Sequence, residues 1–281
     1  MFKSKKIITL TLAAALFAGQ AYAAKLPKTE EELKDFIIKT VMENPHAVIN
    51  VLMANPEMVL ETAQNGSKKL QIIGLKNQWI IDKRTTKEIR TEGRPVLGDK
   101  KAAITMVQFT NFNCPHCKSA KATMNGLLQE HKDIKLVLKF MPLEPTGPSI
   151  TAAKWYHAIA QQNPEQALHF YDTVTDNIEL LQKDGENYLK KVVETLAIDK
   201  GKFVQAIFED TAANKMLQED REDAEKLGIS GTPCFVINNV VIRGALPPEF
   251  FKEALNIALA KETPEPEQVK RFEKLINTQK K

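Results

Sequence analysis

Residues 102–120, with the sequence AAITMVQFTNFNCPHCKSA, run from an apolar segment directly into two closely spaced cysteines. The first eight residues are mostly apolar and predict a buried strand. Pro115 can begin a helix, because the first helical position needs no backbone N–H. A second apolar run, residues 134–140, predicts another strand after that helix. The two strands and the helix between them predict a βαβ unit with the cysteines at the turn from strand to helix.

Cys114 and Cys117 are compatible with three kinds of site besides a redox centre. A zinc site needs four ligands, but Cys234 is the chain's one other cysteine, and His131 and His157 are expected on the surface or on a helix face. Haem attachment needs a histidine directly after the second cysteine, where this chain has a lysine. A structural disulfide across two residues closes too small a loop to stabilise much. We therefore interpret the pair as a redox-active dithiol that holds no metal and needs no cofactor.

The position of the pair at a helix start predicts a role for each residue. The Cys114 sulfur faces unpaired backbone N–H groups and the positive end of the helix dipole, which stabilise a thiolate. His116, when protonated, adds a positive charge beside it. Both effects favour the reduced form and predict an oxidising disulfide. Cys114 is therefore expected to be the nucleophile, and Cys117, one turn further in, is expected to resolve the mixed disulfide.

The remainder of the chain adds helices and a second strand pair. Residues 148–227 are expected to be mostly helical. The segment GTPCFVINNVVIRG, residues 231–244, predicts a β-hairpin with its Asn-Asn dipeptide at the turn, since asparagine tolerates positive φ. A last helix is expected over about 247–260. Residues 261–281 are charged and interrupted by proline, so they are expected to form a solvated C-terminal tail.

The segment before the first strand is predicted to be helical over about residues 29–90. The Asn-Pro pairs at 44–45 and 55–56 each restart a helix, because asparagine caps and proline fits the first turn. Ser67 is expected to begin a longer helix. Short helices with modest apolar stripes have little core of their own, so they are expected to pack on the main domain or on another copy. Gly and Pro in residues 92–99 indicate a linker.

The N-terminus has the pattern of a secretory signal peptide. Three lysines precede an apolar run too short to span a bilayer, and Ala21-Tyr22-Ala23 offers a cleavage site. Cleavage near Ala23 makes residues 1–23 a signal peptide and predicts an oxidising compartment, most simply the bacterial periplasm. Attachment to the outer membrane is also compatible with this pattern.

Charge and cysteine content exclude other classes of protein. The chain has 39 basic and 35 acidic residues. Three of the lysines belong to residues 1–23, which carry no acidic residue, so the mature chain has 36 against 35 and a net charge of +1. Such a balance gives no indication of nucleic-acid binding. Three cysteines are too few for a disulfide scaffold, so the fold is expected to be held by packing.

The segments FTNFNCPHCKSA, residues 109–120, and GISGTPCFVINN, residues 228–239, together resemble the thioredoxin-fold thiol oxidoreductases of the DsbA type. The resemblance covers roughly residues 95–260. It implies an α/β, thioredoxin-like fold with a helical insertion at about 148–227, preceded here by an N-terminal α-helical region at 24–94.

The resemblance also implies a substrate loop. Pro233 is expected to be a cis-proline packed against the cysteine pair, and Thr232 to offer its backbone to an extended substrate peptide. Two positions depart from the family pattern or stand out. Gln108 occupies the place of a buried acid that commonly shuttles protons to the resolving thiol. Cys234 is interpreted either as a small buried strand residue or as a third thiol that tunes the site.

The helical segment gives a second resemblance, to periplasmic disulfide isomerases of the DsbC and DsbG kind, which have an N-terminal dimerisation region. We therefore expect a homodimer through residues 24–94 that forms, and also isomerises, disulfides in unfolded or misfolded secreted proteins. A membrane redox partner is expected to reset the dithiol. The alternative is a holdase chaperone or envelope surface protein in which the redox centre is secondary.

Overall fold

The computed structural model describes residues 29–144, 146–208 and 212–263. The predicted signal peptide, residues 1–23, lies outside the described residues, as does most of the predicted tail. The chain divides into two compact units, residues 1–67 and 68–281. No helix in the described part of the chain is long and apolar enough to cross a membrane.

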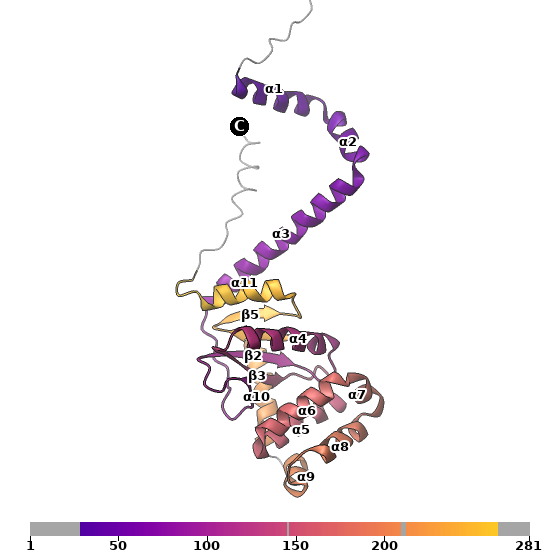
Figure 1. The fold of residues 1–281 in the computed structure, drawn as a ribbon, viewed down its shortest axis with the longest axis vertical. Coiled ribbons are helices and arrows are strands. Elements are labelled where there is room, and N and C mark those ends of the chain that lie inside the picture. The colour runs from indigo at the N-terminus through magenta and orange to yellow at the C-terminus, as the bar shows by residue number, and fades with distance from the viewer. Residues whose placement is uncertain (1–28, 145, 209–211, 264–281) are drawn as a thin grey trace, which may run out of the picture. The chain divides into compact units, whose positions relative to one another are not determined.

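The described part of the first unit, residues 29–67, is built from helices (Figure 1). They are α1 (Glu30–Glu43), α2 (Pro45–Ala54) and the first part of α3 (Pro56–Lys83). Both helix restarts at the Asn-Pro pairs are confirmed, since α2 and α3 each begin at a proline. The expected start at Ser67 is wrong, because α3 runs through it without a break. Gly66 inside the helix costs about 1 kcal/mol of helix stability. This cost is smaller than that of ending one helix and nucleating another.

A five-stranded sheet forms the centre of the second unit. Its strands are β1 (Val96–Gly98), β2 (Ile104–Thr110), β3 (Ile134–Phe140), β4 (Cys234–Ile237) and β5 (Val240–Arg243), in the order β1-β3-β2-β4-β5. Strands β2 and β3 pair in parallel, and the other pairs are antiparallel. Helix α4 (Pro115–Glu130) joins β2 to β3, which confirms the predicted βαβ unit.

The second strand pair is the predicted hairpin. Asn238 and Asn239 form its turn with φ of 43° and 71°, the left-handed region that asparagine tolerates better than most residues. The first strand of the hairpin begins at Cys234, three residues later than the start of the predicted segment 231–244. Residues 231–233 therefore form a loop that leads into the sheet.

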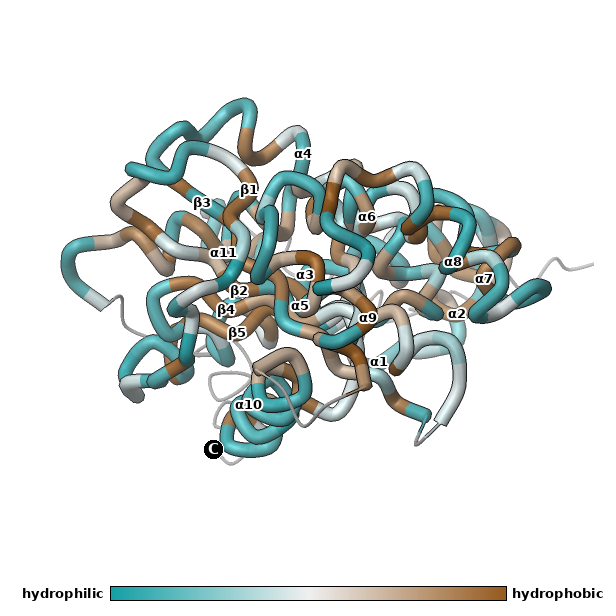
Figure 2. Tube along the Cα trace, turned by 90° about the horizontal axis from the view of Figure 1, so that it is seen from below, coloured by the Kyte–Doolittle hydropathy of each residue, from teal (hydrophilic) through white to brown (hydrophobic). Residues whose placement is uncertain are grey.

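Helices cover the sheet, and a group of them forms a separate helical layer on the side away from β5. Helices α5 to α9 contact one another and lie together away from β5 (Figure 1). The helices between the two strand pairs, and the last helix, are α5 (Pro148–Gln162), α6 (Pro164–Asp176), α7 (Ile178–Asp184), α8 (Glu186–Thr195), α9 (Lys200–Phe208), α10 (Ala212–Lys226) and α11 (Pro248–Leu259). The strands of the sheet are mostly hydrophobic, whereas α10 is hydrophilic along most of its length (Figure 2).

The two faces of the sheet pack into separate apolar clusters. The larger cluster joins one face to α4, α5 and α11, and it includes Trp79 and Ile80 at the end of α3. The smaller one holds Val107, Phe109 and Cys234 from the other face, with Ala224 of α10. The end of α3 is therefore part of the core of the second unit.

A buried ion network fixes α10 to the sheet. The Lys139 ammonium on β3 lies 3.1 Å from Asp220 and 2.8 Å from Asp223. Arg94, in the segment before β1, lies 2.6 Å from Asp220. His157 of α5 is fully buried with its Nε2 3.1 Å from the same carboxylate. The expectation that His157 lies on the surface is wrong, because Asp220 offers it a buried partner.

Candidate active site

The two cysteines lie where β2 ends and α4 begins. Asn111 shapes the turn, since its side-chain oxygen accepts hydrogen bonds from the Asn113 backbone N–H at 3.1 Å and from the Ser149 hydroxyl. Cys114 then takes the N-cap position of α4 with extended backbone angles, φ −112° and ψ 109°. Its side chain is partly exposed, whereas Cys117 is fully buried one turn further along.

The surroundings of Cys114 favour its thiolate. The pKa of Cys114 is lowered to about 5, first because the Cys117 thiol donates a hydrogen bond to it. The Thr232 side chain and the backbone N–H groups of Cys117 and His116 lower it further, while burial acts in the opposite direction. Free N–H groups at a helix start are the expected source of such stabilisation. At neutral pH Cys114 is therefore ionised when the pair is reduced.

Cys117 has the opposite character. The hydrogen bond that it donates to Cys114, together with burial, raises the pKa of Cys117 far above its usual value. The reduced pair therefore shares one proton at neutral pH, and that proton stays on Cys117. His116 lies exposed in the first turn of α4. Its backbone N–H is among the groups that lower the pKa of Cys114.

The loop before β4 completes the site. The Thr232–Pro233 peptide bond is cis, as the resemblance implies. The Cys114 sulfur lies 3.4 Å from the Thr232 carbonyl oxygen. The Pro233 carbonyl accepts a hydrogen bond of 2.9 Å from the backbone N–H of Gly244, which ties the loop to the end of β5. Sequence positions more than a hundred residues apart thus meet at one sulfur atom.

A cavity of about 230 Å³ opens beside this loop. Residues 229–234 line it together with Arg243 and Gly244. Arg243 is the one residue with a charged side chain among those that line it. Arg243 carries no signal of such a role in the sequence, because an arginine at the end of a strand has the pattern of an ordinary solvent-exposed residue.

Gln108 and Cys234, the two positions that stand out in the sequence, are both buried. Gln108 on β2 is 1% exposed, and its side-chain nitrogen has no hydrogen-bond partner among the described residues. Cys234 is 1% exposed in the smaller apolar cluster, and burial raises its pKa to about 12. Cys234 therefore stays protonated at neutral pH and packs as a small apolar side chain.

Phe112 is a structural residue of the site that sequence reasoning missed. It lies between two asparagines in the turn and is 1% exposed. Its ring stacks on Phe140 with centroids 4.8 Å apart and meets Tyr171 edge-on at 5.8 Å. The one signal for this role is an aromatic residue in an otherwise polar turn. Packing of this ring holds the turn against the core.

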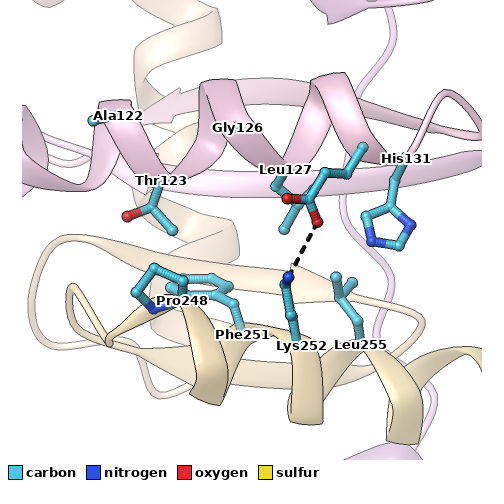
Figure 3. A pocket seen from close by; sticks show the side chains of 10 residues that line it. Ala122, Thr123, Gly126, Leu127, His131, Pro248, Phe251, Lys252 and Leu255 are labelled. Atoms are coloured by element: carbon cyan, nitrogen blue, oxygen red, sulfur yellow. Dashed lines mark ion pairs between the residues drawn. The ribbon is translucent and has the colours of Figure 1, made fainter.

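A second cavity, of about 200 Å³, lies between α4 and α11 (Figure 3). Leu127, Phe251 and Leu255 give it an apolar lining, and Lys252 forms an ion pair with Glu130 at 3.3 Å. No cysteine lines it, so it is separate from the dithiol. Within the described residues, no group of three or more His, Cys, Asp or Glu side chains is arranged to hold a metal ion.

Comparison with known proteins agrees with this geometry. The sequence model of the family described as Thioredoxin matches residues 90–257, more than half of the chain. Disulfide bond formation protein D of Bacillus subtilis is 22% identical over 176 residues, which are 58% of this chain and 76% of that protein. The Na(+)/H(+) antiporter NhaA 3 of Salinispora tropica is 27% identical over 173 residues, 61% of this chain. The match covers only 26% of that antiporter's length.

A solved structure gives a similar result. Proteus mirabilis ScsC in a transitional conformation superimposes with a TM-score of 0.52 and 21% identity, over 82% of this chain and 98% of that one. At this level of identity the likeness shows the fold. The predicted α/β, thioredoxin-like fold with a helical insertion is therefore confirmed.

Proposed function

The chain belongs to the thioredoxin family, and on that premise we propose that it is a protein thiol:disulfide oxidoreductase whose redox-active disulfide joins Cys114 and Cys117. The observation that carries the proposal is the asymmetry of the pair. One sulfur is accessible and has a pKa of about 5, while the other is fully buried. Such an arrangement gives one thiol that reacts with substrates and one that reacts internally.

The proposed reaction is a thiol–disulfide exchange in two steps. A substrate thiolate attacks the Cys114 sulfur, which breaks the Cys114–Cys117 bond, forms a mixed disulfide and releases Cys117 as a thiolate that takes up a proton. A second thiolate of the substrate then attacks the substrate sulfur of the mixed disulfide. This attack breaks the bond to Cys114, forms the substrate's disulfide and releases the Cys114 thiolate. Two electrons pass to the protein, and the substrate gains one disulfide.

The low pKa of Cys114 supports the oxidising direction. The Cys114 thiolate is a good leaving group, and its stabilisation favours the reduced pair over the disulfide. The disulfide form therefore tends to accept electrons from substrate thiols. We assign His116 to thiolate stabilisation through its backbone N–H, and Thr232 with Pro233 to binding the substrate backbone beside Cys114.

Proton transfer to Cys117 follows a different route from the one that a buried acid provides. Gln108 cannot titrate, so the proton that Cys117 takes up comes from water or from another group. Gln108→Glu places a titratable carboxyl in the same strand position. If proton supply limits turnover, this variant oxidises a dithiol peptide faster than the natural chain; an unchanged rate shows that proton supply does not limit it.

The first unit supports self-association. Every described residue from 29 to 67 is exposed, including large apolar side chains such as Phe36, Val51 and Met53. Exposed apolar surface of this extent is typical of a protein interface. We propose a homodimer through residues 24–94, with isomerase activity at a cleft between two active sites. A monodisperse monomer at micromolar concentration, measured by light scattering, contradicts the dimer.

We further propose that the chain acts on unfolded or misfolded secreted proteins in the bacterial periplasm, with a membrane redox partner that resets the dithiol. The alternative function is a holdase chaperone or envelope surface protein, and the same exposed apolar side chains favour it. Replacing both Cys114 and Cys117 by serine distinguishes the two. A cellular phenotype that survives this replacement favours the holdase.

The activity test is reactivation of scrambled ribonuclease and oxidation of a dithiol peptide, with the full mature chain and a shortened chain that begins at Lys68. The shortened chain keeps Trp79 and Ile80, which belong to the core of the second unit. Oxidation by both chains, with reactivation by the full chain alone, supports an oxidase whose first unit adds isomerase activity. Failure of both chains to oxidise the peptide refutes the proposed function.

A further inference from the structure

The cavity beside the substrate loop is lined by Thr232, whose carbonyl oxygen lies 3.4 Å from the Cys114 sulfur, and by one positively charged residue, Arg243. Thr232 lines it and contacts Cys114, so a peptide held in a mixed disulfide with Cys114 lies at its entrance. Arg243 contributes the charge from the end of β5, an edge strand of the sheet. Because Arg243 pairs with Cys234 in the hairpin, it lies only two residues along from Thr232 on the neighbouring strand.

Arg243 has capacity to bind a further anion. Its side chain is 50% exposed, and its ion pair with Asp82 has a distance of 3.5 Å. A strong charge-assisted hydrogen bond is shorter, about 2.7–2.9 Å. A guanidinium has five N–H donors in a planar fork that fits a carboxylate with two parallel bonds.

Two charged residues lie close to Arg243. Asp82 is the acid that pairs with Arg243, and its other oxygen accepts a hydrogen bond from the Gln78 side chain. The Lys87 ammonium donates a hydrogen bond to the backbone oxygen of Asp82. Neither Asp82 nor Lys87 lines the cavity, so Arg243 is the one charged residue of its lining that a bound peptide meets.

We propose that Arg243 gives the enzyme a preference for substrate peptides that carry a carboxylate close to the reacting cysteine. This inference rests on the proposed function and names its substrate class. An extended peptide advances about 3.3 Å per residue, so a carboxylate two or three residues from the cysteine lies about 7–10 Å from the sulfur. The carboxylate comes either from an Asp or Glu side chain or from the C-terminus of the peptide.

The test compares three dithiol peptides that differ only at one position near the first cysteine or at the C-terminus. One carries Glu two residues from the cysteine, one carries Gln there, and one carries Gln with a free C-terminal carboxylate in place of the amide. Each set is made with the altered position before and after the cysteine. The rate constant for oxidation by the protein is divided by the rate with a small disulfide, because a nearby carboxylate also changes the reactivity of the peptide thiol.

The expected result is a Glu-to-Gln rate ratio of about five to ten at low salt, which corresponds to about 1 kcal/mol, and a smaller ratio in 0.5 M NaCl. Arg243→Gln brings the ratio close to one, and Arg243→Lys retains part of it. Asp82→Asn removes the competing carboxylate and raises the ratio. Lys135→Gln, a loss of one positive charge on β3, which β2 and β4 separate from β5, leaves the ratio unchanged. A preference for the free C-terminus over Glu assigns the carboxylate to a chain end.

Two results overturn the inference. One is a ratio near one in the natural protein for both carboxylate sources and both positions. The other is a clear preference that Arg243→Gln does not reduce. In both cases oxidation of the neutral peptide shows that the proposed function itself stands. If no peptide is oxidised at all, the proposed function fails, and this inference fails with it.

Discussion

The two units of the chain both carry large apolar side chains, but only the second unit buries them. Phe36 in α1 is 45% exposed, whereas Phe140 in β3 is 0% exposed. The helices of the first unit satisfy their own backbone hydrogen bonds, so they form without a core. A sheet needs partners far away in the sequence, and those partners enclose its side chains. The proposed dithiol chemistry therefore lies in the unit that can bury a thiol, while the exposed unit is suited to contacts with other molecules.

The buried ion network gives the largest expected difference between the units. Asp220 accepts from Arg94, Lys139, His157 and the backbone N–H of Phe140, all in the interior. Asp220→Ala removes the carboxylate that the buried Arg94 and Lys139 share, so the free energy of unfolding is expected to fall by about 3–5 kcal/mol. Urea denaturation followed by tryptophan fluorescence measures it.

The control for this variant lies in the first unit. Glu43 pairs with Lys39 at 3.8 Å, and their side chains are 62% and 74% exposed. Glu43→Ala is expected to change the unfolding free energy by less than about 0.5 kcal/mol, because water screens such a pair. Equal effects of the two variants contradict the account of the network.

The same substitution at an aromatic residue in each unit gives the second comparison. Phe140→Ala opens a cavity beside Phe112 and Tyr156 and is expected to cost about 3 kcal/mol or slightly more. Phe36→Ala removes an exposed ring and is expected to leave the unfolding transition within about 0.5 kcal/mol. Both tryptophans, Trp79 and Trp155, lie buried in the second unit, so their fluorescence reports its unfolding.

A charged substitution in the first unit distinguishes an effect on dimer formation from an effect on folding. Val51 in α2 is 63% exposed. Val51→Lys is expected to leave the unfolding midpoint of the second unit and peptide oxidation nearly unchanged, while it shifts the protein from dimer towards monomer in sedimentation velocity. Val204→Lys introduces the same charge at a 49% exposed apolar position outside residues 24–94 and is the control. An assembly state that is the same for all three proteins contradicts an interface through α2.

Local patterns in the sequence predicted the elements that position the site. Pro115 at a helix start, the apolar runs of β2 and β3, and the Asn238-Asn239 turn each depend on neighbouring residues. The meeting of Cys114 with Thr232 depends on the fold as a whole, and it was expected only through the resemblance to a known family. The sequence alone therefore predicted the position of the pair at a helix start, and the resemblance predicted the loop beside it.

The buried ion network could not be predicted, because its members are far apart and look ordinary. Asp220 and Asp223 belong to an acidic run in α10 that reads as a solvated helix face. Lys139 gives the one local hint, as a charge inside an apolar strand. His157 was misread for the same reason, since its partner lies 63 residues away. Pairing between distant charges is a property of the tertiary structure.

The central claim is the asymmetry between Cys114 and the other two thiols, and site-resolved alkylation tests it most directly. The reduced protein is treated briefly with iodoacetamide between pH 3.5 and 8, and the modified peptides are quantified by mass spectrometry. Because its pKa is lowered to about 5, Cys114 is a thiolate above that pH. Its alkylation rate is expected to be nearly constant above pH 6 and to fall about tenfold per pH unit below 5. Cys117 and Cys234, both buried with raised pKa values, are expected to react far more slowly throughout. A Cys114 midpoint near 8.5, or equal labelling of all three cysteines, would contradict the account.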